Sequence, residues 1–180
     1  MNHRRTFGRS ARAAWGAVIA VTLALLWAGP AAAAQPTRLT HSPGPVSHYP
    51  AGSGCEFDVS AYHTGRTTVV DYSDGREVFE THYIDYTIVN DGNGKTFVTN
   101  LIHHEVDRYD AANDVYRGVS SGDTIFTFLP GDVGPDGGIV DHNFSIYAKG
   151  TVTYVVDGTT FATLGISIQG RYTDICAAIS

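Results

Sequence analysis

Basic residues are scarce in this sequence beyond residue 34. Only eight of the 12 Lys and Arg residues lie there, whereas all 18 Asp and Glu residues do, so this part carries a net charge of −10 with histidine neutral. Such a surface repels phosphate backbones and anionic lipid headgroups. The charge balance therefore argues against nucleic acid and membranes as partners.

Long apolar runs and helical periodicity are also lacking after residue 34. No stretch there reaches the roughly 20 apolar residues that a membrane-spanning helix needs. Apolar residues instead alternate with polar ones, or cluster in β-branched and aromatic runs between Gly, Asn and Asp turns. This pattern predicts an all-β domain.

The first 34 residues have the features of an export signal. Arginines precede an apolar run from about Ala13 to Ala28, and three alanines before Gln35 suit a signal peptidase. We therefore expect a signal peptide at 1–34 that directs export by the general or the twin-arginine route and is then removed. A Pro/Gly-rich disordered arm is expected at 35–54 and one domain at 55–180. The mature protein is expected to be secreted, with no membrane contact after cleavage.

Two cysteines, Cys55 and Cys176, bracket nearly the whole expected domain, and they are the only ones in the chain. Outside the cell such a pair is expected to form a disulfide. A chain-entropy model assigns a link across so long a loop about 4–5 kcal/mol. The sequence therefore predicts a domain joined end to end by one disulfide.

Long strands joined mainly by short turns predict an antiparallel up-and-down meander. Because closure removes exposed sheet edges, we expect a closed barrel stapled by the disulfide, with a β-sandwich as the alternative. A two-residue turn at Asp157 and Gly158 would place Gly150 opposite Gly165 at a bend. The expected strands span about 55–62, 66–72, 76–90, 95–109, 115–129, 143–156 and 159–175.

Ionisable residues gather on the hairpin of strands 76–90 and 95–109. A turn centred on Gly92 and Asn93 would pair His82 with His103. It would place both histidines, together with Glu80 and Glu105, on one face of the hairpin, where they continue an apolar stripe. An interior that becomes polar at one end is typical of the mouth of a ligand-binding barrel. The expected ligand-binding residues are His82, His103, Glu80, Glu105, Tyr86, Ile84 and Leu101.

This arrangement admits three functions. The first is a secreted barrel that binds a small, mostly apolar ligand in its interior. The second is an isomerase-type or cyclase-type enzyme, with His82 or His103 as general base and a glutamate orienting it. The third is an extracellular interaction or inhibitor protein without a small-molecule site.

The sequence assigns no catalytic residue, cofactor or metal site. The two histidines and two glutamates have ligand chemistry for Zn²⁺, but their spacing matches no named motif. Asp132, Asp136 and Asp141 have oxygen ligands for Ca²⁺, but in a loop where Asp and Gly suit any turn. Residues 118–122 match the pattern G-x-S-x-G, yet a nucleophile elbow requires a helix after the serine. Because residues 123–129 are expected to form a strand, we do not expect Ser120 to be a nucleophile.

The chain as a whole resembles small secreted actinobacterial proteins of unknown function. The resemblance rests on the alanine-rich signal, the Pro/Gly arm before Cys55, and a β meander that ends at Cys176. It implies no catalytic residues. Lipocalin-like and allene-oxide-cyclase-like barrels are comparable by fold analogy alone. The Gly-x-Trp opening of lipocalins is lacking, because Trp15 and Trp27 both lie in the signal.

Overall fold

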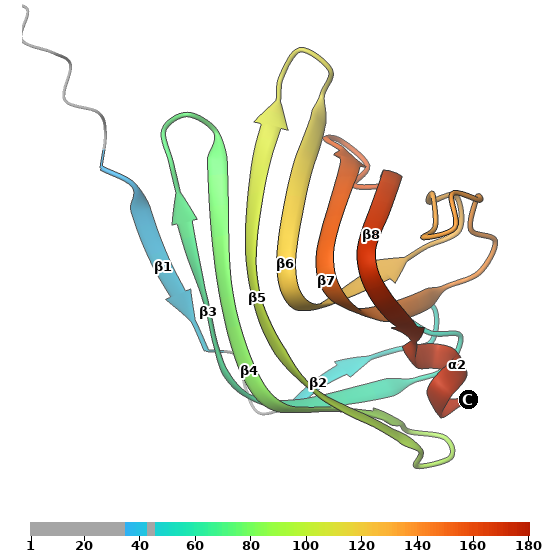
Figure 1. Cartoon of the computed structure of the whole chain (residues 1–180). Helices are drawn as coiled ribbons and strands as arrows, with labels where there is room; N and C mark the ends of the chain where they lie inside the picture. Colours follow the sequence, from blue (N-terminus) through green and yellow to red (C-terminus); the bar gives the residue numbers. More distant parts are fainter. Residues whose placement is uncertain (1–34, 43–45) are drawn as a thin grey trace, which may run out of the picture. The chain divides into compact units, whose positions relative to one another are not determined.

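The computed structural model describes residues 35–42 and 46–180, which form an all-β antiparallel meander ending in a short helix (Figure 1). The expected signal peptide, residues 1–34, lies outside the described residues. Among the described residues, no helix is both long and apolar enough to cross a membrane. The elements in chain order are β1 (Thr37–His41), β2 (Val46–Tyr49), β3 (Val59–Asp71), β4 (Arg76–Asn90), β5 (Thr96–Asp110), β6 (Val115–Phe128), β7 (Phe144–Asp157), β8 (Thr163–Asp174) and α2 (Ile175–Ile179).

All these strands belong to one sheet, in the order β1-β3-β4-β5-β6-β7-β8, with β2 also paired to β3. Hydrogen bonds do not close this sheet: across residues 35–42 and 46–180, β8 pairs with β7 alone. The expectation of a closed barrel is therefore not supported. The short strands β1 and β2 take the edge of β3 that closure would need.

Strands β1 and β2 lie inside the segment predicted to be a disordered arm, so that prediction is wrong for residues 37–41 and 46–49. Their side chains are mostly exposed, and backbone pairing with β3 holds them in place. Pro36 and Pro50 flank the two strands, where a missing N–H breaks no ladder bond.

The predicted strands from 76 onward are confirmed, with small shifts at their ends. The first two predicted strands are one strand, β3, which has an irregular register between Tyr62 and Thr64. The last predicted strand begins four residues later than expected, because the β7–β8 loop extends to Ala162, and it ends one residue earlier, where α2 begins. Asp174 caps this helix by accepting a hydrogen bond from the Ala177 N–H at 2.9 Å.

A row of three glycines crosses the sheet at one level, with Gly122 paired to Gly150 and Gly150 to Gly170. Their φ angles are 117°, 130° and 153°, a region that side-chain-bearing residues rarely adopt. The prediction that Gly150 faces Gly165 is wrong: Gly165 pairs with Val155, because the β7–β8 loop is longer than a two-residue turn.

The sheet divides at this glycine row. Pairing of β5 with β6 ends at His103 and Gly122, so the first part of β5 and the last part of β6 run apart. In Figure 1 the lower ends of β3, β4 and β5 pass beneath the ends of β6 and β7. We call the sheet face that carries Ser120 and Val152 the inner face, and the opposite face the outer face.

The division creates two apolar cores. One lies between the inner face of β3–β4 and the outer face of β6–β7, and α2 closes it. The other covers the inner face of β6–β8 beneath the loop that holds Val140. The buried residues of the first core are Cys55, Val59, Ala61, Ile88, Ile175, Cys176 and Ile179; those of the second are Phe128, Val140, Ile146, Ala148, Val152 and Tyr154.

The predicted disulfide is confirmed. Cys55 and Cys176 are joined across 121 residues, with a Cα–Cα distance of 5.5 Å. The link ties the segment before β3 to α2, which follows the opposite edge strand, β8. A covalent bond therefore connects the two sides of the sheet where backbone hydrogen bonds do not.

Candidate functional site

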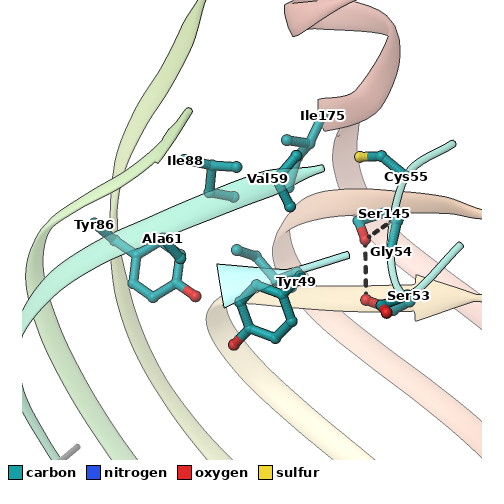
Figure 2. A pocket seen from close by; sticks show the side chains of 12 residues that line it. Tyr49, Ser53, Gly54, Cys55, Val59, Ala61, Tyr86, Ile88, Ser145 and Ile175 are labelled. Carbon is teal, nitrogen blue, oxygen red and sulfur yellow. Dashed lines mark hydrogen bonds between the residues drawn. The ribbon is translucent and has the colours of Figure 1, made fainter. Parts of the chain in front are cut away.

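A cavity of about 130 Å³ lies within the first core, between one layer formed by β3–β4 and another formed by β6–β7. We call it the interlayer cavity. Figure 2 shows Val59, Ile88 and Ile175 on one side of it and the rings of Tyr49 and Tyr86 on another. The cavity is lined mainly by apolar side chains from β3, β4, β6 and α2. Its full lining is Tyr49, Ser53, Gly54, Cys55, Val59, Ala61, Tyr86, Ile88, Ile125, Thr127, Ser145 and Ile175.

Three polar groups in the cavity wall, the Thr127 and Ser145 hydroxyls and the Gly54 carbonyl, are linked by hydrogen bonds (Figure 2). Ser145 Oγ donates to the Gly54 carbonyl at 3.0 Å and lies 2.9 Å from Thr127 Oγ1, which donates to it. Because these hydroxyls are already paired, they leave few free hydrogen-bonding positions for a water molecule in the cavity. Apolar cavities of this kind remain dry and accept apolar guests.

Two tyrosines form the solvent side of the cavity. Tyr49 is 41% exposed, so its ring stands between the cavity and solvent. Burial raises the pKa of the Tyr86 hydroxyl, and the neighbouring Tyr49 adds to the effect. The Tyr86 ring stacks on His63 with centroids 5.2 Å apart. The mouth therefore combines aromatic surface with two hydroxyl groups.

A partly buried hydrogen-bond network holds β2, and hence Tyr49, against β3. Ser60 Oγ donates to Asp91 Oδ2 at 2.9 Å and lies 2.8 Å from His48 Nδ1. Ser60 is only 1% exposed, and its hydroxyl hydrogen is donated to Asp91 rather than to His48, so this group does not have the arrangement of a catalytic triad. This Ser, His and Asp group therefore positions the cavity mouth.

The predicted ligand-binding residues do not form one site. Strand β4 has a bulge in which Ile84 and Asp85 oppose Asn100 alone, and Asp85 has a φ of 54°. This extra residue shifts the pairing by one, which reverses the faces of β4 beyond the bulge. His82 consequently pairs with Ile102 rather than with His103.

The prediction that Glu80, His82, His103 and Glu105 share one face is therefore wrong. Glu80 pairs with His104 and projects from the outer face, as His82 does. Ile84 lies in the bulge and is 47% exposed. Leu101 is buried on the inner face but is not part of the cavity wall. Of the seven predicted residues, Tyr86 alone lines the cavity.

His103 and Glu105 remain together on the inner face, with His103 Nε2 and Glu105 Oε2 4.0 Å apart. Burial lowers the pKa of His103 and raises that of Glu105. Both shifts favour the neutral forms. Their side chains are 13% and 18% exposed, so they are mostly buried but still reachable from solvent.

Neither of the two other sequence motifs has the geometry of the site that it suggested. Asp132 is buried and accepts hydrogen bonds from the N–H groups of Leu129 and Thr163, both at 2.8 Å. Within residues 35–42 and 46–180, no group of three or more His, Cys, Asp or Glu side chains is placed to hold a metal ion. Ser120 lies in the middle of β6, without the helix that a nucleophile elbow needs.

Most cavity residues had no distinguishing signal in the sequence. Val59, Ile125 and Ile175 look like ordinary core residues, and Tyr49 lies in the segment expected to be disordered. Comparison of the chain with models of known families, with curated proteins and with solved structures finds no match. The geometry of the cavity is therefore the main indication of function.

Proposed function

We propose that this protein is a secreted binding protein whose interlayer cavity receives a small, mostly apolar ligand. The observation that supports the proposal is the apolar cavity itself, with the Thr127 and Ser145 hydroxyls paired and two tyrosines at its mouth. Ligand sites are commonly concave and apolar, with a few polar groups that orient the ligand.

The volume sets the size of the ligand. The cavity holds about 130 Å³, close to the roughly 150 Å³ of an engineered apolar cavity that binds benzene or xenon. A single aromatic ring or a short alkyl segment therefore fits. A polar substituent would lie near the hydroxyls of Tyr49 and Tyr86.

The geometry does not favour the isomerase-type alternative as the sequence suggested it. His82 projects from the outer face of the sheet, and His103, which stays beside Glu105 on the inner face, does not line the cavity. No histidine–glutamate pair therefore faces a ligand in the cavity. An interaction or inhibitor protein is the competing proposal, and it predicts no response of the cavity to small apolar molecules.

Filling the cavity is expected to abolish binding. Ala61 is 2% exposed and its side chain lines the cavity, so Ala61→Leu places three more carbons inside it. We expect benzene to shift amide signals of cavity residues in the wild-type NMR spectrum, and its affinity to fall at least tenfold in the variant. The enlarged side chain occupies existing space, so the variant should remain folded.

Ala112→Leu is the matched control, because it makes the same chemical change in the exposed β5–β6 turn. This variant should bind benzene as the wild type does. Equal binding by Ala61→Leu, or no binding by the wild type, would contradict the proposal. The second outcome would favour the interaction protein.

A further inference from the structure

The inner face of the sheet carries a row of carboxylates that directly oppose each other. Asp71 pairs with Glu77, and Glu77 pairs with Asp107. Glu105 lies two residues along β5 on the same face. Like charges opposite each other across strands destabilise a sheet. These four side chains therefore form an arrangement that folding alone does not favour.

Positive charge is segregated to the other face. Every Lys or Arg within strands β1–β8 projects from the outer face, so none neutralises the inner carboxylates. The pairings that place them there are Arg38 with Val70, Arg66 with His82, Arg76 with Arg108, Arg108 with Arg117, and Lys149 with Arg171.

Burial makes the negative charge of this group unfavourable. Burial raises the pKa of Asp107 to about 6, and the neighbouring Glu105 adds to the effect. The pKa of Glu105 is raised by burial, and that of Glu77 by burial together with Asp71 and Asp107. Nearby His103 provides no compensating charge, because burial lowers its pKa.

A buried hydroxyl beside Glu105 has no partner. Ser120 pairs with Glu105 across β5 and β6, and its side chain is completely buried. Its Oγ makes no hydrogen bond of acceptable geometry within the part of the chain that the structure describes. Buried polar atoms without partners are rare in folded proteins and require an explanation.

Tyr154 extends this polar group across β6. Its hydroxyl donates to Asp107 Oδ1 at 2.6 Å. The ring reaches Asp107 by lying over Gly118, where any side chain would collide with both the ring and the carboxylate. One carboxylate oxygen of Asp107 is thus held in place, and the carboxyl group keeps a defined direction.

Aromatic rings lie one step farther along the same face. Tyr109 pairs with Tyr116, with ring centroids 5.0 Å apart, and Phe161 stacks on Tyr116 at 6.1 Å. Tyr109 is 40% exposed and Phe161 67% exposed, so much of this surface is free. Aromatic faces attract organic cations through the negative charge of their π systems.

From this juxtaposition we infer that the inner face binds the protonated amine of an organic ligand. The ammonium group lies between Glu105 and Asp107 with Ser120 Oγ as a further acceptor, and the hydrocarbon part lies on the rings of Tyr116 and Phe161. An ammonium donates up to three hydrogen bonds, which suits two carboxylates and a hydroxyl. This site is separate from the apolar cavity, and either one can exist without the other.

Benzylammonium chloride is the probe, with benzyl alcohol as its uncharged counterpart. We expect benzylammonium at pH 7.5 to shift amide signals of residues 105–107 and 118–120 in a saturable manner. The double variant Glu105→Gln/Asp107→Asn should weaken binding at least tenfold. Because it keeps the shapes and acceptor oxygens of both side chains, its amide spectrum should remain dispersed. The single variant Glu105→Gln provides a second test if the double variant does not fold.

Glu80→Gln/Asp85→Asn is the matched control, because it removes the same charge from the opposite face and should bind as the wild type does. Three results would overturn the inference. These are no binding by the wild type, undiminished binding by the inner-face variants, or equal binding of benzyl alcohol at residues 105–107. Loss of benzylammonium binding in Ala61→Leu would also overturn it, because the probe would then occupy the apolar cavity.

Discussion

Loss of the Cys55–Cys176 disulfide is expected to lower the free energy of unfolding by about 4 kcal/mol, since the link closes a loop of more than 100 residues. The two cysteines are 121 residues apart and lie in the core that surrounds the cavity. The bond also holds α2, whose Ile175 forms part of the cavity wall. Its loss should therefore weaken both the fold and ligand binding.

Urea unfolding with and without reductant measures this effect. The double variant Cys55→Ala/Cys176→Ala is the control, because its stability should be low in both conditions and insensitive to reductant. An unchanged urea midpoint for the reduced wild type would show that packing of α2, rather than the disulfide, holds the two sides of the sheet together.

A side chain in the glycine row is expected to have a comparably large effect. A Cβ atom at Gly170 would overlap the Lys149 carbonyl, and one at Gly150 would overlap the Gln169 carbonyl. Both glycines also have positive φ angles, 153° at Gly170 and 130° at Gly150. Relief of these overlaps requires the strands to separate at the level where the sheet divides. Gly170→Ala should therefore destabilise the protein by about 3 kcal/mol or more.

Gly165→Ala is the matched control in the same strand. A Cβ atom there has open space around it, and its φ lies outside the left-handed region. Thermal unfolding followed by circular dichroism should show a much lower Tm for Gly170→Ala and a nearly unchanged Tm for Gly165→Ala. Equal Tm values would mean that the glycine row does not shape the sheet.

Local patterns in the sequence were sufficient to predict the meander. Alternating β-branched and aromatic residues marked β4 to β8, and glycine-containing turns such as Asn90 to Gly94 marked the hairpins. The two cysteines predicted the disulfide, because they are the only pair available. These features depend on neighbours in sequence or on simple counting.

The candidate site was not predictable in the same way, because it depends on contacts between distant segments. The β4 bulge is held by Asn100, whose side-chain oxygen accepts a hydrogen bond from the Asp85 N–H at 3.1 Å. No periodicity within β4 reveals this contact, and without it His82 and His103 would share a face. The cavity likewise forms because β5 and β6 part at Gly122, a consequence of the glycine row across three strands.

Xenon binding in pressurised crystals tests most directly whether the interlayer cavity receives apolar ligands. Xenon enters dry apolar cavities of this size and is located by its strong scattering. We expect one xenon atom in contact with Val59, Ile88 and Ile175, which line the cavity. Absence of xenon there, with ordered water or repacked side chains in its place, would contradict the proposed function.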